Sequence, residues 1–253
     1  MIKRGDILSG QYKRDEEGRD LVIVGIGETA ELAYEYFKFD SPHEVVGFAV
    51  EAAFKDREEF FGLPVVAFEE IEKHFSPEEH LAFAAISYTQ LNRVRARIFK
   101  TLKAKGYTCA SMISSAAFVW HNAEIGENCF IFENNVIQYK VKIGDNVVLW
   151  SGNHIGHQTV IEDNVFISSH VVVSGYCTVG ANSFMGVNSS VANDVKIAPD
   201  NIIAMGAVIH KHTEPRKIYK GNPGKMDETK DSFAVMKVKE ETETAATGDD
   251  ANQ

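Results

Sequence analysis

The stretch that decides the fold is residues 142–167, which read KIGDNVVLWSGNHIGHQTVIEDNVFI. In this stretch an aliphatic side chain returns at every sixth residue, beginning at Ile143. Extended in both directions, the same step meets an aliphatic residue or Met at fifteen consecutive positions, from Ile125 to Ile209. Neither the helical period nor the two-residue period of a strand produces this series. A period of six predicts a parallel β-helix, in which each short strand points one large aliphatic side chain inward before the chain turns a corner.

A second period marks the corners of this coil. Asn recurs at every eighteenth residue and Asp continues the series, at Asn128, Asn146, Asn164, Asn182 and Asp200. Asn and Asp tolerate left-handed backbone geometry and bond to nearby amides, so they suit a repeated corner. Three edges of six residues therefore predict one triangular coil for every eighteen residues, held to the next coil by parallel strand pairing.

Residues 21–112 follow a different pattern, in which apolar runs alternate with helical periodicity. The expected elements are strands over 21–24, 45–50 and 81–86 and helices over 31–39, 68–75 and 91–105. This alternation predicts a small Rossmann-like α/β domain with a parallel sheet. The last helix carries six cations, which predict a solvated face or, alternatively, attraction of a diphosphate; they are Arg93, Arg95, Arg97, Lys100, Lys103 and Lys105.

The charge is concentrated near one end of the chain. The formal net charge is −10, and half of it comes from residues 226–253, which we expect to form an acidic, disordered tail. Residues 1–20 are polar and predict a flexible arm. The acidic balance argues against nucleic acid as a partner, and no apolar run reaches the ~18 residues of a membrane span. Three cysteines make no disulfide framework and the start has no secretory signal, so we expect a cytoplasmic protein.

The layout of these motifs resembles a known family. The aliphatic-Gly-x-Asn hexapeptides lie between an α/β domain with Gly25-x-Gly27 and a closing Gly221-Asn222-Pro223-Gly224-Lys225. This order is similar to the hexapeptide-repeat sugar-nucleotide N-acetyltransferases of the sialic-acid O-acetyltransferase-like and bacillosamine-pathway group. The resemblance implies a left-handed β-helix acyltransferase domain over residues 113–225, an exception to the usual right-handed crossover. It also implies acetyl-CoA as co-substrate, a nucleotide-linked amino sugar bound by residues 21–112, and a homotrimer with active sites between subunits.

The segment 151–159 contains the candidate catalytic residues. His154 and His157 flank the inward-pointing Ile155, and an imidazole can remove a proton from an attacking amine or hydroxyl near neutral pH. The resemblance favours His157 as the general base. The family often has an acidic residue next, where this chain has Gln158, and a second His nine residues on, where it has Phe166. Further candidate members of the site are Asn153, His154 and His170, the last stacked on Gly152 by the eighteen-residue step.

Small residues mark the candidate binding positions. Gly175 stacks on His157 by the eighteen-residue step, and its amide could hold the oxyanion of the thioester carbonyl. The resemblance implies that further small residues line the pantetheine groove: Gly186, Val187, Ala204 and Gly206. In the α/β domain a strand, a glycine turn and a helix N-terminus suit a phosphate, and the candidate substrate-binding residues are Gly25, Gly27, Glu28 and Glu51. Ala30 replaces the third glycine of the dinucleotide fingerprint, which makes NAD weakly supported.

Three alternatives stay open at this stage. The first is transfer of the acetyl group to a sugar hydroxyl. The second is a zinc hydratase like the γ-type carbonic anhydrases, suggested by His121 and His157 two coils apart, although Glu162 stands where a third His is needed. The third is a solenoid without catalytic activity. We expect no metal, and the zinc content of the purified protein separates the second alternative from the others.

Overall fold

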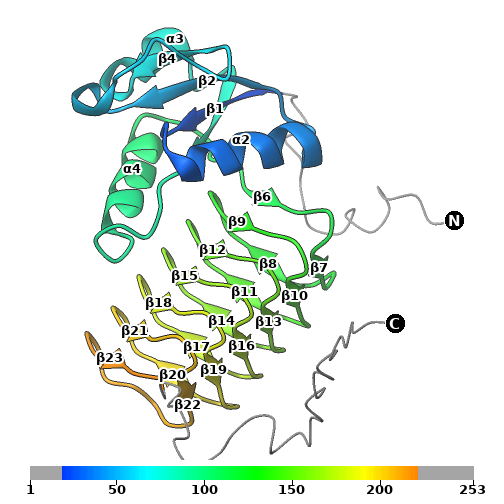
Figure 1. The fold of residues 1–253 in the computed structure, drawn as a ribbon. Helices are drawn as coiled ribbons and strands as arrows, with labels where there is room; N and C mark the ends of the chain where they lie inside the picture. The colour runs from blue at the N-terminus through cyan, green and yellow to red at the C-terminus, as the bar shows by residue number, and fades with distance from the viewer. Residues whose placement is uncertain (1–18, 222–253) are drawn as a thin grey trace, which may run out of the picture. The chain divides into compact units, whose positions relative to one another are not determined.

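Figure 1 shows the computed structural model, which describes residues 19–221. The expected tail, the expected arm up to residue 18 and the closing motif beyond Gly221 lie outside the described residues. Within residues 19–221 no helix is long and apolar enough to cross a membrane. An α/β layer and a long coil of two-residue strands make up the described chain, and both belong to one compact unit.

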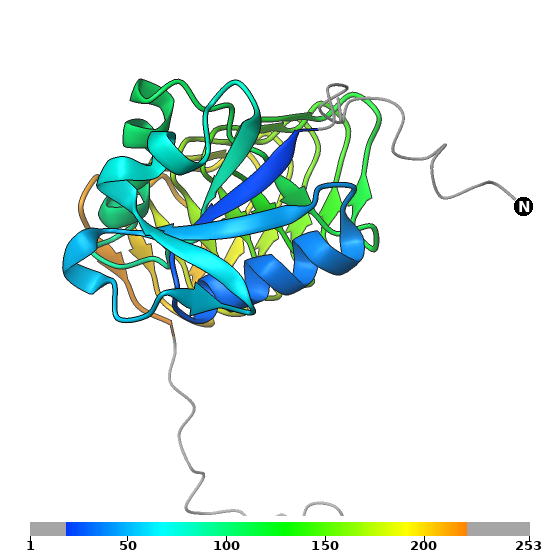
Figure 2. The same ribbon diagram turned by 90° about the horizontal axis from the view of Figure 1, so that it is seen from above.

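The α/β layer is built on a five-stranded sheet in the order β3-β4-β2-β1-β5 (Figure 2). The strands are β1 (Asp20–Val24), β2 (Val45–Val50), β3 (Glu59–Phe60), β4 (Leu63–Ala67) and β5 (His80–Ala84). The helices are α2 (Glu28–Asp40), α3 (Ile71–His74) and α4 (Arg93–Ala104), with 3-10 turns η1 (Ala52–Phe54) and η2 (Phe68–Glu70). All neighbours pair in parallel except β3 with β4, so the predicted parallel sheet is confirmed.

The two faces of the sheet have different cores. On one face α2 packs through Ala33 and Phe37 on strand residues such as Ile23 and Phe83. On the other face α3 and α4 pack through Ile71, Ile98 and Leu102. Because β1 is followed by β2 on one side and flanked by β5 on the other, the strand order reverses beside β1. In open α/β sheets, ligands bind in the crevice at this switch point, outside the carboxyl ends of the strands.

The structure changes some predicted boundaries. The strands β3 and β4 were not predicted, because the run at 63–67 is short and contains Pro64. The helix expected over 68–75 is a 3-10 turn followed by a single α-helical turn. The helix expected from 91 begins at Arg93, because Gln90, Leu91 and Asn92 all have left-handed backbone angles, with φ of 53°, 51° and 66°.

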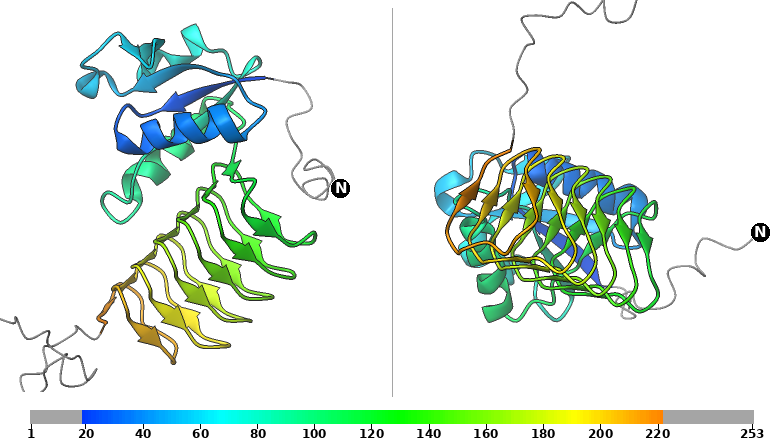
Figure 3. Two further views of the ribbon diagram at one scale, coloured as in Figure 1. Left: turned by 45° about the vertical axis from the view of Figure 1, so that its right-hand side comes forward. Right: turned by 90° about the horizontal axis from the view of Figure 1, so that it is seen from below.

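The coil stacks its strands into three parallel sheets, here called the first, second and third face (Figure 3). The first face holds β6 (Met112–Ile113), β9 (Phe130–Ile131), β12 (Val148–Leu149), β15 (Phe166–Ile167), β18 (Phe184–Met185), β21 (Ile202–Ile203) and β23 (Ile218–Tyr219). The second face holds β7 (Phe118–Val119), β10 (Val136–Ile137), β13 (His154–Ile155), β16 (Val172–Val173), β19 (Ser190–Val191) and β22 (Val208–Ile209). The third face holds β8 (Glu124–Ile125), β11 (Lys142–Ile143), β14 (Val160–Ile161), β17 (Thr178–Val179) and β20 (Lys196–Ile197).

Both periods of the sequence appear in this coil. The positions of the six-residue step are buried from Ile131 to Ile209, and Ile125 packs against the same core. Strands eighteen residues apart pair in register, for example Val136 with His154. The Asn corner has left-handed backbone angles throughout, with φ from 55° at Asn128 to 62° at Asp200. The predicted triangular parallel coil is confirmed.

The α/β layer covers the first face of the coil. Phe130, Val148 and Phe166 of this face belong to the same buried cluster as α2 and the sheet. Polar contacts hold the two parts together: the Tyr36 hydroxyl donates to Glu133 at 2.6 Å, and the Asn92 amide donates to the Asn182 carbonyl at 3.1 Å. The second and third faces lie on the sides of the coil away from these contacts.

Candidate functional site

His157 lies at the corner between the second and third faces, in the turn after β13; residues 156–159 are here called the His157 corner. Its imidazole lies directly over Gly175 of the next coil. A Cβ atom placed on Gly175 would stand 2.6 Å from Cε1 and 2.7 Å from Nε2 of the ring. The absence of a side chain at Gly175 therefore makes the space in which the partly exposed imidazole lies.

Two further residues hold His157. Its backbone N–H donates to Oε1 of Gln138 at 3.0 Å, and its ring meets the Tyr176 ring edge-on, with centroids 4.9 Å apart and planes at 89°. The Tyr176 N–H donates to the His157 carbonyl at 3.0 Å. Neither Gln138 nor Tyr176 is among the residues predicted for the site. Both lie nineteen positions from His157, one coil plus one residue, so the eighteen-residue period could have found them.

The other predicted catalytic residues are divided between the corner, a face and the interior. Gln158 is exposed at the His157 corner, with φ of 59°, and its N–H donates to the Tyr139 carbonyl. His154 is half-buried in β13, on the second face. Asn153 is buried in the coil, where its amide bonds to the Trp150 carbonyl and the Val171 N–H. Asn153 is thus a structural residue that satisfies backbone groups.

His170 lies at another corner. A Cβ atom on Gly152 would stand 2.6 Å from its Nδ1, so the predicted stacking of His170 on Gly152 is present. This corner joins the first and second faces, and the whole second face lies between it and His157. An edge of six residues at about 3.3 Å each spans as much as about 20 Å. The structure therefore does not bring His170 to His157 within one chain.

The residues predicted to bind acetyl-CoA also lie at two different corners of the coil. Gly175 lies with His157, whereas the other four follow β18 and β21 and lie at the corner with His170: Gly186, Val187, Ala204 and Gly206. Gly206 donates its N–H to the Val187 carbonyl at 2.9 Å, which stacks the two turns. The candidate acyl-transfer residues of one chain thus lie at two corners, on either side of the second face.

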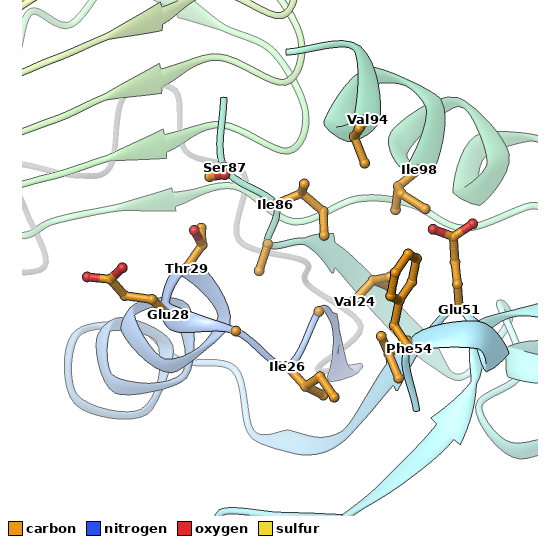
Figure 4. A pocket seen from close by; sticks show the side chains of 14 residues that line it. Val24, Ile26, Glu28, Thr29, Glu51, Phe54, Ile86, Ser87, Val94 and Ile98 are labelled. Carbon is orange, nitrogen blue, oxygen red and sulfur yellow. The ribbon is translucent and has the colours of Figure 1, made fainter. Parts of the chain in front are cut away.

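The predicted substrate residues come together in one cavity. A cavity of about 380 Å³ lies at the carboxyl ends of β1, β2 and β5, and Gly25, Gly27, Glu28 and Glu51 all line it (Figure 4). Gly25 has φ of 133°, and a Cβ atom there would lie 2.7 Å from the Ala85 carbonyl oxygen, so only glycine fits. Gly27 precedes α2 with open space above it. This cavity is in the crevice expected from the strand order.

Glu51 is already paired inside this region. Its carboxylate accepts two hydrogen bonds from Arg97 of α4, at 2.8 Å from Nη1 and 2.9 Å from Nη2. This guanidinium holds the pKa of Glu51 below its usual value. The pair fixes the rim of the cavity and leaves the outer lone pairs of the carboxylate available to a ligand.

The basic helix α4 has the predicted solvated face, where Arg93, Arg97, Lys100 and Lys103 are exposed, and Arg95 is the exception. Arg95 is only 1% exposed and lies over the Phe166 ring at 5.8 Å, with Nη2 3.4 Å from the Asn164 carbonyl oxygen. Burial lowers the pKa of its guanidinium to about 9, so it remains charged at neutral pH. Arg93 pairs with Asp200 of the coil. Three arginines of α4 therefore serve contacts within the protein, because this helix is held between the sheet and the coil.

Phe166 occupies the position where many members of the family that this chain resembles have a second His. It lies on the first face, packed on Tyr88 and Phe184 with ring centroids 5.1 and 5.5 Å away. Phe166 thus stabilises the contact between the α/β layer and the coil, on a different face from His157.

Two further sets of side chains in the described part of the chain are the cysteines and the possible metal ligands. Cys109, Cys129 and Cys177 are buried, and burial raises the pKa of the first two thiols to about 12, which keeps them protonated. Among residues 19–221 no three His, Cys, Asp or Glu side chains are grouped to hold a metal ion. His121 and His157 share a corner two coils apart.

Comparison with known proteins agrees with this architecture. Residues 122–157 and 140–175 match the family model for the bacterial transferase hexapeptide (six repeats). Among solved structures, the acetyltransferase domain of PglB from Neisseria gonorrhoeae FA1090 is 22% identical, with a TM-score of 0.72 over 82% of this chain and 98% of that one.

Two other solved structures share this fold. A perosamine N-acetyltransferase variant from Caulobacter crescentus, in complex with CoA and GDP-perosamine, is 21% identical, with a TM-score of 0.68 over 79% of this chain and 90% of that one. WeeI from Acinetobacter baumannii AYE is 18% identical, with a TM-score of 0.68 over 81% of this chain and 98% of that one. The fold is therefore the expected left-handed parallel β-helix preceded by an α/β domain.

Proposed function

We propose that this protein is an acyl-CoA-dependent N-acetyltransferase that moves an acetyl group from acetyl-CoA to the amine of a nucleotide-linked amino sugar. The observation that carries the proposal is the partly exposed His157 imidazole held over the backbone of Gly175 at one corner of a hexapeptide coil. The solved enzyme of this fold that holds CoA and GDP-perosamine supports both substrate classes.

His157 acts as the general base in this reaction. It accepts a proton from the sugar amine as the amine nitrogen attacks the thioester carbonyl. Within residues 19–221 no backbone oxygen accepts the Gly175 N–H, which leaves this amide available to the oxyanion of the tetrahedral intermediate. The intermediate then collapses, the C–S bond breaks and the CoA thiolate leaves, taking up a proton.

The acceptor nucleotide binds in the cavity of the α/β layer. Its diphosphate lies against Gly25, Gly27 and the N-terminal end of α2, where the helix dipole and free backbone space favour an anion. Glu51, held by Arg97, faces the ribose side of this cavity. The volume of about 380 Å³ falls within the usual range for small-molecule sites. We propose a cytoplasmic location for the enzyme.

A second copy of the chain completes the site. The cavity belongs to the α/β layer on the first face, whereas His157 lies at the opposite corner of the triangle. One chain therefore cannot bring its bound sugar to its own His157. The second face presents exposed apolar side chains, with Phe118, Val172 and Val208 between 44% and 70% exposed, which suits contact with another copy. The separation of the cavity from His157 and the exposed apolar second face support a homotrimer with active sites between subunits.

The test is a thiol-release assay on the full chain, with acetyl-CoA and a panel of UDP-, dTDP- and GDP-linked amino sugars. We expect His157→Ala to lower kcat about 10²- to 10⁴-fold, because a general base contributes about that much. His121→Ala, on the same corner two coils away, is the matched control and should retain full turnover.

Other outcomes would favour the alternatives. Unchanged turnover in His157→Ala would remove this residue as the base. Activity on a hydroxyl acceptor alone would establish O-acetylation. Stoichiometric zinc in the purified protein, with loss of the metal in both His121→Ala and His157→Ala, would favour the hydratase. Absence of turnover and of nucleotide binding would favour a solenoid without catalytic activity.

A further inference from the structure

We infer that the end of the α/β cavity bounded by Phe54 is a nucleobase slot, in which the base of the nucleotide-linked acceptor stacks on the Phe54 ring. The inference rests on the proposed function, because it assumes that the cavity takes a nucleotide. It assigns to Phe54, Val94 and Ile98 a binding role that no sequence motif indicates.

Phe54 is an exposed aromatic residue at the wall of a cavity. It ends the 3-10 turn that follows β2, and its side chain is 67% exposed although it lines the cavity. The neighbouring rings pack on one another: Phe48 and Phe61 lie 5.0 and 4.7 Å from Phe60, measured between centroids. Within the described residues no aromatic ring lies against Phe54 in this way. Its face is therefore available for stacking.

The opposite side of the slot is aliphatic. Val94 and Ile98 project from α4 toward the same part of the cavity as Phe54 (Figure 4). An aromatic face opposite branched aliphatic side chains suits a flat, largely apolar ring, as in base-stacking sites on proteins. The Glu51–Arg97 ion pair borders this end and supplies polar groups where a base or ribose presents its own.

The slot lies at the right place relative to the phosphate position. Gly25 and Gly27 follow β1, and Phe54 follows β2, the strand paired directly with β1. Both positions line the same cavity of about 380 Å³, so one nucleotide can span them. In nucleotide-binding α/β sheets the diphosphate lies at the first strand's turn and the ribose lies toward the end of the second. A base at Phe54 continues that order.

The base in the slot could belong to either of two ligands, the nucleotide of the acceptor sugar or the adenine nucleotide of CoA. The slot belongs to the α/β layer, whereas His157 and Gly175 lie on the coil away from the first face. We therefore assign the slot to the acceptor, and CoA should not compete for it.

The test is isothermal titration calorimetry of the full chain with UDP, dTDP, GDP, CoA and inorganic pyrophosphate. We expect at least one of the three nucleoside diphosphates to bind, and Phe54→Ala to weaken that binding about 5- to 150-fold, the range for loss of one base–aromatic stack. Phe54→Tyr keeps the ring and should bind within about threefold of the wild type. Phe39→Ala is the matched control, because Phe39 is 73% exposed on α2 and does not line the cavity.

Pyrophosphate has no base, so its affinity should be the same for the wild type and for Phe54→Ala. Equal affinity shows that the variant is folded and that the loss of nucleotide binding comes from the lost stacking contact. Nucleotide affinity that survives Phe54→Ala overturns the slot and leaves the proposed function standing. A wild-type protein that binds none of the three nucleoside diphosphates overturns both. Displacement of the bound nucleotide by CoA overturns the assignment to the acceptor.

Discussion

The position of the His157 imidazole depends on a single absent methyl group. Gly175 has an ordinary negative-φ or extended backbone, so alanine is tolerated by the chain itself, but its Cβ would lie 2.6 Å from the ring. Contacts this short cannot persist, and the end of a side chain gives way more readily than the stacked backbone of the coil. The glycine therefore serves the geometry of the site more than the stability of the coil.

We predict that Gly175→Ala lowers kcat at least about tenfold while the thermal unfolding midpoint changes by only a few degrees. A displaced base loses the alignment on which proton transfer depends. The thiol-release assay and circular dichroism measure the two effects. Adding Gly175→Ala to His157→Ala should cause no further loss, and a further loss would show that the glycine acts independently of the imidazole.

At the scale of the element, the first three residues of the Asn corner form a ladder of side-chain hydrogen bonds. Asn128 donates to Oδ1 of Asn146 at 2.8 Å, and Asn146 donates to Oδ1 of Asn164 at 2.7 Å. Each residue also has the left-handed backbone angle that a turn of this kind requires. The ladder ties three coils together and continues to the sheet, since Asn128 accepts the Ala84 N–H at 2.7 Å.

We predict that Asn146→Ala lowers the free energy of unfolding by about 3 kcal/mol, from two lost buried hydrogen bonds and the cost of a left-handed alanine. Asn188 is the control, because its φ of 57° matches the 58° of Asn146 but its side chain is exposed at another corner. Asn188→Ala should cost only about 1 kcal/mol. Urea unfolding of both variants gives the comparison, and equal losses would mean that the ladder contributes nothing.

At the scale of the whole molecule, the three faces of the coil differ in what they contact or expose. The first face is covered by the α/β layer, the second presents apolar side chains, and the third presents charged ones such as Lys142 and Lys196. A face that exposes Val172 and Val208 to water is unfavourable unless another surface covers it.

We predict that Val172→Glu reduces the mass in solution from that of a trimer to that of a monomer, since a buried unpaired carboxylate opposes association. Acetyl transfer should be lost with it, while nucleoside diphosphate binding in the cavity persists. Light scattering after size-exclusion chromatography measures the mass. Lys196→Glu on the third face is the control and should remain a trimer. A monomeric Lys196→Glu protein, or a trimeric Val172→Glu protein, would contradict the assignment of the second face as the interface.

The sequence by itself determined the features that depend on local repetition. The six-residue step fixed the coil, and the eighteen-residue step placed Gly175 over His157 and Gly152 beside His170, because stacked coils keep one register throughout. The glycine turn after β1 was also predictable from the sequence, since Gly25 has a backbone angle that other residues rarely adopt. These properties follow from neighbours in the chain or from a constant spacing.

Only the tertiary structure decided what depends on docking one part against another. The sequence does not say which face of the coil the α/β layer covers, and that choice buries Arg95, uses Phe166 for packing and separates the cavity from His157. The slot at Phe54 likewise exists only where the ends of β2 and α4 meet. Such contacts join residues far apart in sequence and depend on the complementarity of whole surfaces, for which the periodic pattern carries no signal.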